Sequence, residues 1–91
     1  MKFEWDTKKA LSNLEKHCIS FEEASTVFGD FLSITIEDPL HSQEENRFIL
    51  IGKSIALSTL IVVHIEQSES IRIISARKAT KKEQKIYEDQ K

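Results

Sequence analysis

The chain has 91 residues, of which 40% are hydrophobic and 31% charged, and its formal net charge is -2. This length suits one small domain spanning 1–91, and the hydrophobic fraction is too high for a disordered chain. No run of about 18 apolar residues is present and "MKFEWD" lacks a signal-peptide core, so we expect a cytoplasmic protein without a membrane segment. A weakly negative chain is also not expected to coat nucleic acid nonspecifically.

Helical spacing predicts two helices near the N-terminus. After an extended start, Asp6 is the expected N-cap of a first helix, whose buried face is expected to carry Ala10, Leu11, Leu14 and, at its end, Cys18. The segment "SFEE" at 20–23 has the spacing of a capping box and predicts the start of a second helix, which Gly29 is placed to end.

Apolar and β-branched runs dominate the rest of the chain. They predict four strands, within 31–36, 47–52, 59–65 and 71–77. The tight turn "QSES" makes the last two a hairpin, and "TKKE" at 80–83 is a second capping box that begins a final helix. The expected fold is therefore α+β, an antiparallel sheet with two N-terminal helices and a C-terminal helix.

The turn of the last hairpin predicts which side chains share a face. An even-length turn pairs His64 with Ile73 and Val62 with Ser75. This register places His64, Ser75 and Arg77 on one face and Arg72 on the other. A β-bulge near Ser75 would change the assignment.

Charge is distributed unevenly along the chain. Residues 72–91 carry seven basic and three acidic side chains, net +4, whereas the rest carries six basic and twelve acidic ones, net -6. Lys81 and Lys82 fall in the first turn of the last helix, where the helix dipole disfavours cations by about 0.3–1 kcal/mol each. An anion bound there beside Arg77 and Lys78 would offset this cost, and a normally capped helix with solvated lysines is the alternative.

Metal and cofactor chemistry has little support in this sequence. His17, Cys18 and His41 lack ligand spacing, so we expect neither a metal site nor a cofactor. His64 lies in a strand, where a packed histidine is commoner than a catalyst. Arginine, lysine, histidine and glutamate suffice for RNA cleavage, because the 2′-hydroxyl is an internal nucleophile that needs positioning, proton transfer and cationic stabilisation.

The motifs of the chain resemble the BrnT family of bacterial type II toxins. The resemblance rests on "FEWD", "SFEEA", "VVH" and, most specifically, "IRIISARKAT". It implies a RelE-like fold and a ribonuclease activity that arrests translation. It also implies a BrnA-like antitoxin whose ribbon-helix-helix part binds operator DNA as a dimer. The family usually has glycine where this chain has Cys18.

These observations lead to the hypothesis of a metal-independent endoribonuclease toxin. Arg72 and Arg77 would hold the scissile phosphate or its neighbours, and His64 or Glu45 would act as acid or base. The resemblance matches Arg72, Arg77 and Lys78 to the family's basic motif and His64 to its strand histidine. Further expected RNA or phosphate contacts are Lys78, Lys81, Lys82, Lys53 and Arg47.

The expected partners are a BrnA-like antitoxin and RNA, on or off the ribosome, with DNA reached only through the antitoxin. The alternative is a binding module of another class, which uses the same surface to capture an anionic or antitoxin-like protein and catalyses no reaction.

Overall fold

The computed structural model describes residues 1–40 and 46–90 and confirms the α+β class. The helices are α1 (Thr7–His17), α2 (Phe21–Thr26), the short 3-10 helix η1 (Val27–Gly29) and α3 (Lys81–Glu88). The strands are β1 (Lys2–Glu4), β2 (Ile34–Glu37), β3 (Arg47–Lys53), β4 (Thr59–Glu66) and β5 (Ser70–Lys78). Within the described ranges, no helix is long and apolar enough to cross a membrane.

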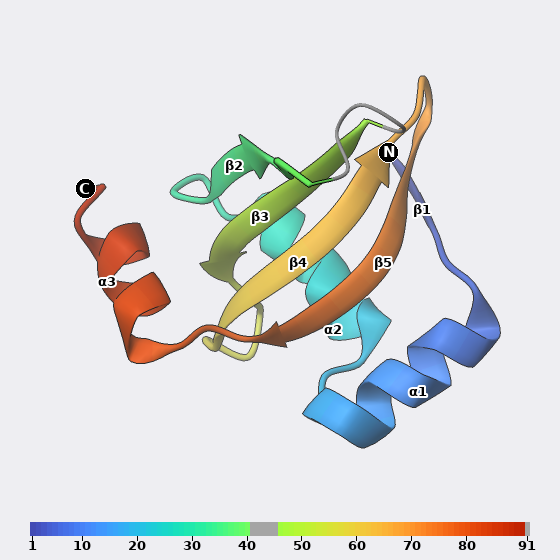
Figure 1. The fold of residues 1–91 in the computed structure, drawn as a ribbon, viewed down its shortest axis with the longest axis horizontal. Helices are drawn as coiled ribbons and strands as arrows, with labels where there is room; N and C mark the ends of the chain where they lie inside the picture. The colour runs from blue at the N-terminus through green and yellow to red at the C-terminus, as the bar shows by residue number, and fades with distance from the viewer. Residues whose placement is uncertain (41–45, 91) are drawn as a thin grey trace.

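The five strands form one mixed sheet in the order β1-β5-β4-β3-β2 (Figure 1). Neighbours from β2 to β5 are antiparallel, as predicted, but β1 lies parallel to β5. The expectation of a purely antiparallel sheet was therefore wrong at this edge. β1 is not joined to β5 by a turn, so chain connectivity does not force an antiparallel pairing.

Local capping signals set where the helices begin. Asp6 Oδ1 accepts hydrogen bonds from the backbone N–H groups of Lys8 and Lys9, at 2.8 and 3.2 Å. Ser20 Oγ accepts from the N–H of Glu23 at 3.0 Å, which caps α2. The Glu23 carboxylate does not close that predicted capping box, because it accepts a hydrogen bond from the Ser54 hydroxyl at 2.7 Å.

Two details of the N-terminal helices differ from the sequence-based expectation. The second helix is only six residues long and tightens into η1, and Gly29 does not have a left-handed backbone. Ala10 packs against the core as predicted, but Leu11 and Leu14 are 60% and 45% exposed, and Cys18 is exposed as well. The buried residue of α1 is instead Asn13, which faces β5.

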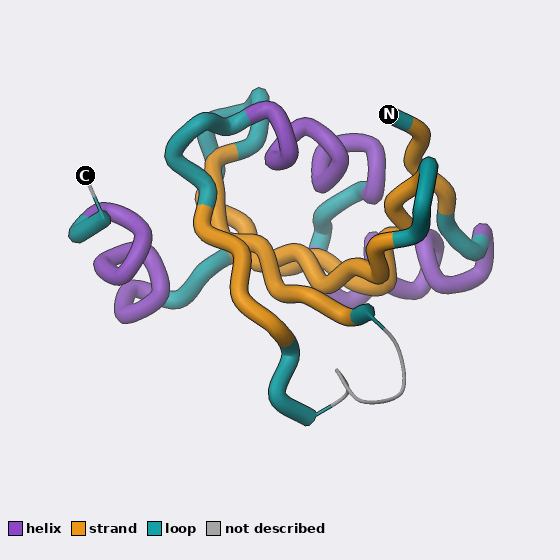
Figure 2. Tube along the Cα trace, turned by 90° about the horizontal axis from the view of Figure 1, so that it is seen from above, coloured by secondary structure: helices purple, strands orange, loops and turns teal. Residues whose placement is uncertain are grey.

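The main core lies between the sheet and the N-terminal helices, and Figure 2 shows α2 on one side of the sheet with α3 beyond its end. Its fully or nearly fully buried members are Ile19, Phe21, Ala24, Val27, Leu50, Leu60, Val62, Ile73 and Ala76. Gly52 lets η1 approach β3 closely, because a Cβ there would lie 2.9 Å from both the Val27 Cγ1 and the Ser33 Cβ. We call this side of the sheet the covered face.

Candidate functional site

A β-bulge in β5 determines which side chains share a face of the sheet. His64 pairs with Ile73 as predicted, but the register then shifts, so that Val63 pairs with Ser75 and Ile74 is the extra residue. Ser75 therefore lies on the face opposite His64, contrary to the predicted register. Beyond the bulge, Arg77 pairs with Ile61 and lies on the same face as Ser75.

The bulge also brings together two arginines that a regular strand would separate. Arg72 and Arg77 are five positions apart, and an odd separation places side chains on opposite faces of an unbroken strand. With one extra residue between them, both project from the face opposite the main core. The prediction that Arg72 and Arg77 lie on different faces was wrong for this reason.

All three arginines of the chain lie on this second face, which we call the open face. Arg47 of β3 pairs with Ile65 of β4, and Ile65 pairs with Arg72 of β5. Arg47, Ile65 and Arg72 therefore form a row across these three strands. Arg77 lies about 13 Å further along the sheet, four residues at roughly 3.3 Å each. Figure 1 looks onto the open face, with α2 behind the sheet.

An apolar trough separates the Arg47–Arg72 row from Arg77. It is a hollow of about 280 Å³ whose middle row is formed by Ile36, Ile49, Val63 and Ser75. The side chains of Arg77, Glu83 and Ile86 lie at the α3 end. α3 covers that end of the open face, where Tyr87 packs with Ile51 and Ile61.

Arg77 forms a two-pronged ion pair with Glu83 of α3. Its Nη1 and Nη2 atoms donate to the two carboxylate oxygens at 2.8 and 2.9 Å. Glu83 also accepts from the N–H of Thr80 and thereby completes the predicted capping box. The hydrogen bonds from Arg77 are the main reason that the pKa of Glu83 falls to about 2, and the same contact raises the pKa of Arg77.

The Arg77–Glu83 ion pair decides between the two interpretations of the lysines in the first turn of α3. A carboxylate of the chain itself already occupies the position where we considered a bound anion. Lys81 and Lys82 are exposed on a normally capped helix, as the alternative interpretation stated.

The other two arginines lie at the opposite end of the trough. Arg72 Nη1 is 3.5 Å from Glu4 Oε1, and both side chains are partly exposed, at 38% and 47%. The two residues are paired across β1 and β5. Arg47 is partly buried at the start of β3.

His64 is not brought together with the arginines. Its side chain lies on the covered face, is 1% exposed, and packs between Phe28 and Phe48 at ring-centroid distances of 4.8 and 5.9 Å. Burial lowers its pKa, although Glu66, whose Oε2 is 3.3 Å from Nε2, acts in the opposite direction. The prediction that His64 and Arg77 lie on the same face of the sheet was therefore wrong.

The remaining predicted residues lie at other places. Lys53 and Lys78 line a polar hollow of about 220 Å³ at the ends of β3 and β5, together with Thr59 and Gln84. Glu45 lies outside the described residues.

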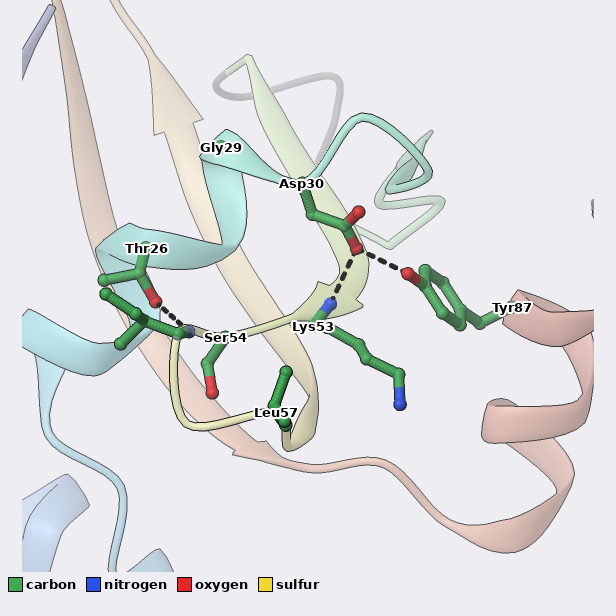
Figure 3. Close-up of a pocket in the computed structure, with 8 residues that line it drawn as sticks. Thr26, Gly29, Asp30, Lys53, Ser54, Leu57 and Tyr87 are labelled. Carbon is green, nitrogen blue, oxygen red and sulfur yellow. Dashed lines mark hydrogen bonds between the residues drawn. The ribbon is translucent and has the colours of Figure 1, made fainter.

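Residues that line a larger hollow beside Lys53 form the contacts that hold α3 in place (Figure 3). Asp30 Oδ2 accepts hydrogen bonds from the Tyr87 hydroxyl at 2.6 Å and from the Lys53 N–H at 2.8 Å. Burial acts to raise the pKa of Asp30, but these hydrogen bonds outweigh it and lower the pKa. Burial and Asp30 raise the pKa of Tyr87 to about 12. The carboxylate is thus already used in docking α3, which carries Glu83.

Sequence reasoning missed the partners of the arginines. Glu83 was recognised as a helix cap, but nothing in the spacing of 77 and 83 indicated an ion pair. Glu4 and Asn13 gave no signal, because their partners on β5 are more than 60 residues away. Among residues 1–40 and 46–90, no group of three His, Cys, Asp or Glu side chains could hold a metal ion.

Comparisons with known proteins agree with this picture. The family described as the ribonuclease toxin BrnT of type II toxin-antitoxin systems matches residues 5–83. The 1.1 Å crystal structure of the Brucella abortus ribonuclease toxin BrnT is similar with a TM-score of 0.70 and 29% identity. The match covers 89% of this chain and 99% of that one. A comparison with curated proteins found no match.

The family match and the structural similarity define the class as the ribonuclease toxins of type II toxin-antitoxin systems. Within that class, the chain belongs to the BrnT family. The resemblance seen in the motifs is confirmed, and membership implies an RNA substrate and an antitoxin partner.

Proposed function

We propose that the chain is a metal-independent endoribonuclease that binds RNA on its open face and arrests translation, as RelE-like toxins do. The observation that carries this proposal is the position of Arg47, Arg72 and Arg77. All three arginines of the chain lie on the face of the sheet opposite the main core, although 72 and 77 reach that face only because of the bulge.

The guanidinium groups supply the positive charge that RNA cleavage requires. A planar guanidinium with five N–H donors can contact a phosphate and stabilise the charge that develops when the 2′-hydroxyl attacks. Arg77 would do so with the N–H groups that remain, because its Nη1 and Nη2 atoms each already donate one hydrogen bond to Glu83. Arg77 and Arg72 are separated by about 13 Å along the sheet, so they hold different phosphates of one strand rather than a single phosphate. Lys53 lies beyond Arg77 in register on the open face and adds positive charge there. Lys78 directly follows Arg77 but pairs with Leu60, so it projects toward the covered face.

The proton acceptor is a carboxylate beside the arginines. Glu83 has a pKa of about 2 and is a weak base, because an effective general base has a pKa near the working pH. Glu4, whose Oε1 is 3.5 Å from Arg72 Nη1, is the candidate among the described residues. Glu45 remains a candidate from the sequence alone. His64 lacks support as the acid or base, since its ring is buried on the covered face.

Membership of a type II toxin family supports a biological role in which an antitoxin controls the chain. A BrnA-like antitoxin binds the chain and suppresses its activity, and its ribbon-helix-helix part provides the contact with DNA. Expression of the chain alone should stop growth, and co-expression of the small protein encoded beside it should restore growth and yield a stable complex.

The direct test is digestion of single-stranded RNA by the purified chain with and without EDTA. We expect cleavage at internal positions, leaving 2′,3′-cyclic phosphate ends, at the same rate in both conditions. Loss of cleavage in EDTA that one divalent metal restores would overturn the metal-independent mechanism. A chain that binds its antitoxin but never cleaves RNA would instead be a binding module.

A further inference from the structure

The trough on the open face differs in chemistry from the arginines around it. Its middle row, Ile36, Ile49 and Val63, is aliphatic, and Ser75 at the end of that row supplies an uncharged polar side chain. Arg72 lies on one side, and on the other side lies Arg77 with its ion-pair partner Glu83, whose side chain also lines the hollow. A phosphate gains nothing from the aliphatic floor, so the floor has to contact a different part of the ligand.

We infer that the trough is a nucleobase subsite, which seats one unpaired base of single-stranded RNA while the flanking arginines hold phosphates. This inference rests on the proposed ribonuclease function. A single strand alternates charged phosphates with flat, largely apolar bases, and unstacked bases are what proteins read in RNA. The arrangement of cations around an aliphatic floor is complementary to that alternation.

The size of the hollow suits a small flat group such as one base. Its volume of about 280 Å³ is just below the range of roughly 300–1,000 Å³ that holds drug-sized molecules. One ring system fits such a space. A protein partner would have to contact far more surface than this hollow, because a stable protein–protein interface buries about 1,200 Å² or more in total. An RNA duplex does not fit either, since its bases are paired and stacked inside the helix.

Ser75 is placed to contact the polar edge of the seated base. Its hydroxyl both donates and accepts hydrogen bonds, so it can pair with amino or carbonyl groups of different bases. The bulge that moves Ser75 onto the open face therefore provides the polar group of the subsite as well as Arg77. Aliphatic side chains stack less strongly than aromatic ones, so the contribution of the base should lie at the low end of known values.

The first experiment uses the unaltered protein and a series of single-stranded RNA oligonucleotides, each with one base removed to leave an abasic ribose. Binding is measured by fluorescence anisotropy. We expect affinity to fall about five- to tenfold when one particular position lacks its base, and to change little at the other positions. Equal affinities across the whole series would overturn the inference.

The second experiment fills the trough with Ser75→Leu and uses Ser12→Leu, at an exposed site of α1, as the matched control. Ser75→Leu should bind intact RNA about as weakly as the unaltered protein binds the abasic strand, and should no longer respond to the missing base. Ser12→Leu should respond as the unaltered protein does. Ser75→Ala, which leaves the trough open, should keep the affinity within about threefold but alter the preference among the four bases.

The outcomes separate this inference from the proposed function. If RNA is cleaved and Arg77→Ala impairs cleavage, but no base position matters, the subsite is absent and the ribonuclease function stands. If the unaltered protein neither binds nor cleaves RNA, the proposed function itself fails. If Ser75→Leu abolishes binding of the cognate antitoxin and leaves RNA binding unchanged, the trough belongs to the antitoxin and the inference is overturned.

Discussion

Cys18 has a left-handed backbone, with φ 59° and ψ 27°, at the C-terminal end of α1. Its N–H donates to the carbonyl of Leu14 at 2.9 Å, the bond that ends the helix. A residue with a Cβ pays about 1–2 kcal/mol for this conformation, whereas glycine adopts it freely. The resemblance to the BrnT family suggested glycine at this position, and the left-handed backbone gives a physical reason for such a preference.

We therefore expect Cys18→Gly to stabilise the fold. The relief of strain exceeds the extra entropy of glycine in the unfolded chain, which leaves about 0.5–1 kcal/mol. This corresponds to a rise in Tm of roughly 2–8 °C, measurable by circular dichroism. Ser12→Gly in the same helix is the control and should lower Tm. An unchanged or lower Tm for Cys18→Gly would refute the strain.

His64 makes stability depend on pH. Burial holds its folded-state pKa below the ordinary value of about 6.5, so the unfolded chain takes up a proton first as the pH falls. Stability is then greatest above about pH 6.5 and decreases below it until the folded state also binds the proton. Glu83 and Asp30 have lowered pKa values, so the stabilisation that their ionised carboxylates provide is lost only at more acidic pH.

Urea unfolding between about pH 5 and 7.5 tests this expectation. The unaltered chain should lose stability as the pH falls through 6.5, and His64→Leu should show a flatter dependence whatever its absolute stability. His17→Gln, at an exposed position, should retain the original slope. The same slope in His64→Leu would show that His64 is not the titrating group.

At the scale of elements, Asn13 links α1 to the bulged part of β5. Its Nδ2 donates to the carbonyls of Ile19 and Ala76 at 3.0 and 2.8 Å, and its Oδ1 accepts from the Ala76 N–H at 3.1 Å. The side chain thus satisfies both backbone groups of a strand residue next to the bulge. Because Arg77 follows Ala76 directly, this contact also fixes the face from which Arg77 projects.

Asn13→Ala should consequently destabilise the fold and reduce activity. Each buried backbone group left unpaired costs about 1–3 kcal/mol, and this change removes the partner of three, the carbonyls of Ile19 and Ala76 and the Ala76 N–H. Chemical unfolding measures the loss, and a matched Ser12→Ala change should cost far less. RNA cleavage at a temperature where the variant is fully folded should still be reduced, because Arg77 is less well held. Unchanged stability would mean that water replaces the amide without cost.

Elements that depend on neighbouring residues could be predicted from the sequence, whereas elements that depend on distant residues could not. The caps at Asp6, Ser20 and Thr80 were predicted correctly, because a cap depends on residues two or three positions away. The bulge near Ser75 was only recognised as a possibility, because its support comes from Asn13, 63 positions before Ala76. The two faces of β5 could not be assigned without it.

At the scale of the whole molecule, one face of the sheet builds the core and the other carries the charge. The N-terminal helices bury the first face, whereas α3 covers one end of the second and is docked there by the Tyr87–Asp30 hydrogen bond. The apolar part of the covered face could be predicted from the strand pattern. The gathering of the three arginines could not, since it depends on strand order and on the bulge together.

We propose that the arginines of the open face act on RNA. The most direct test of this role compares Arg77→Ala with Lys85→Ala. Each variant removes one positive charge, but Lys85 is exposed on α3 and outside the trough. We predict that Arg77→Ala loses about 2–4 kcal/mol of transition-state stabilisation, roughly 30- to 1,000-fold in single-turnover cleavage, and Lys85→Ala less than about fivefold. Both proteins should first be shown to be monodisperse and folded at the assay temperature. Equal cleavage by the two variants would contradict the account and leave Arg77 as the structural partner of Glu83.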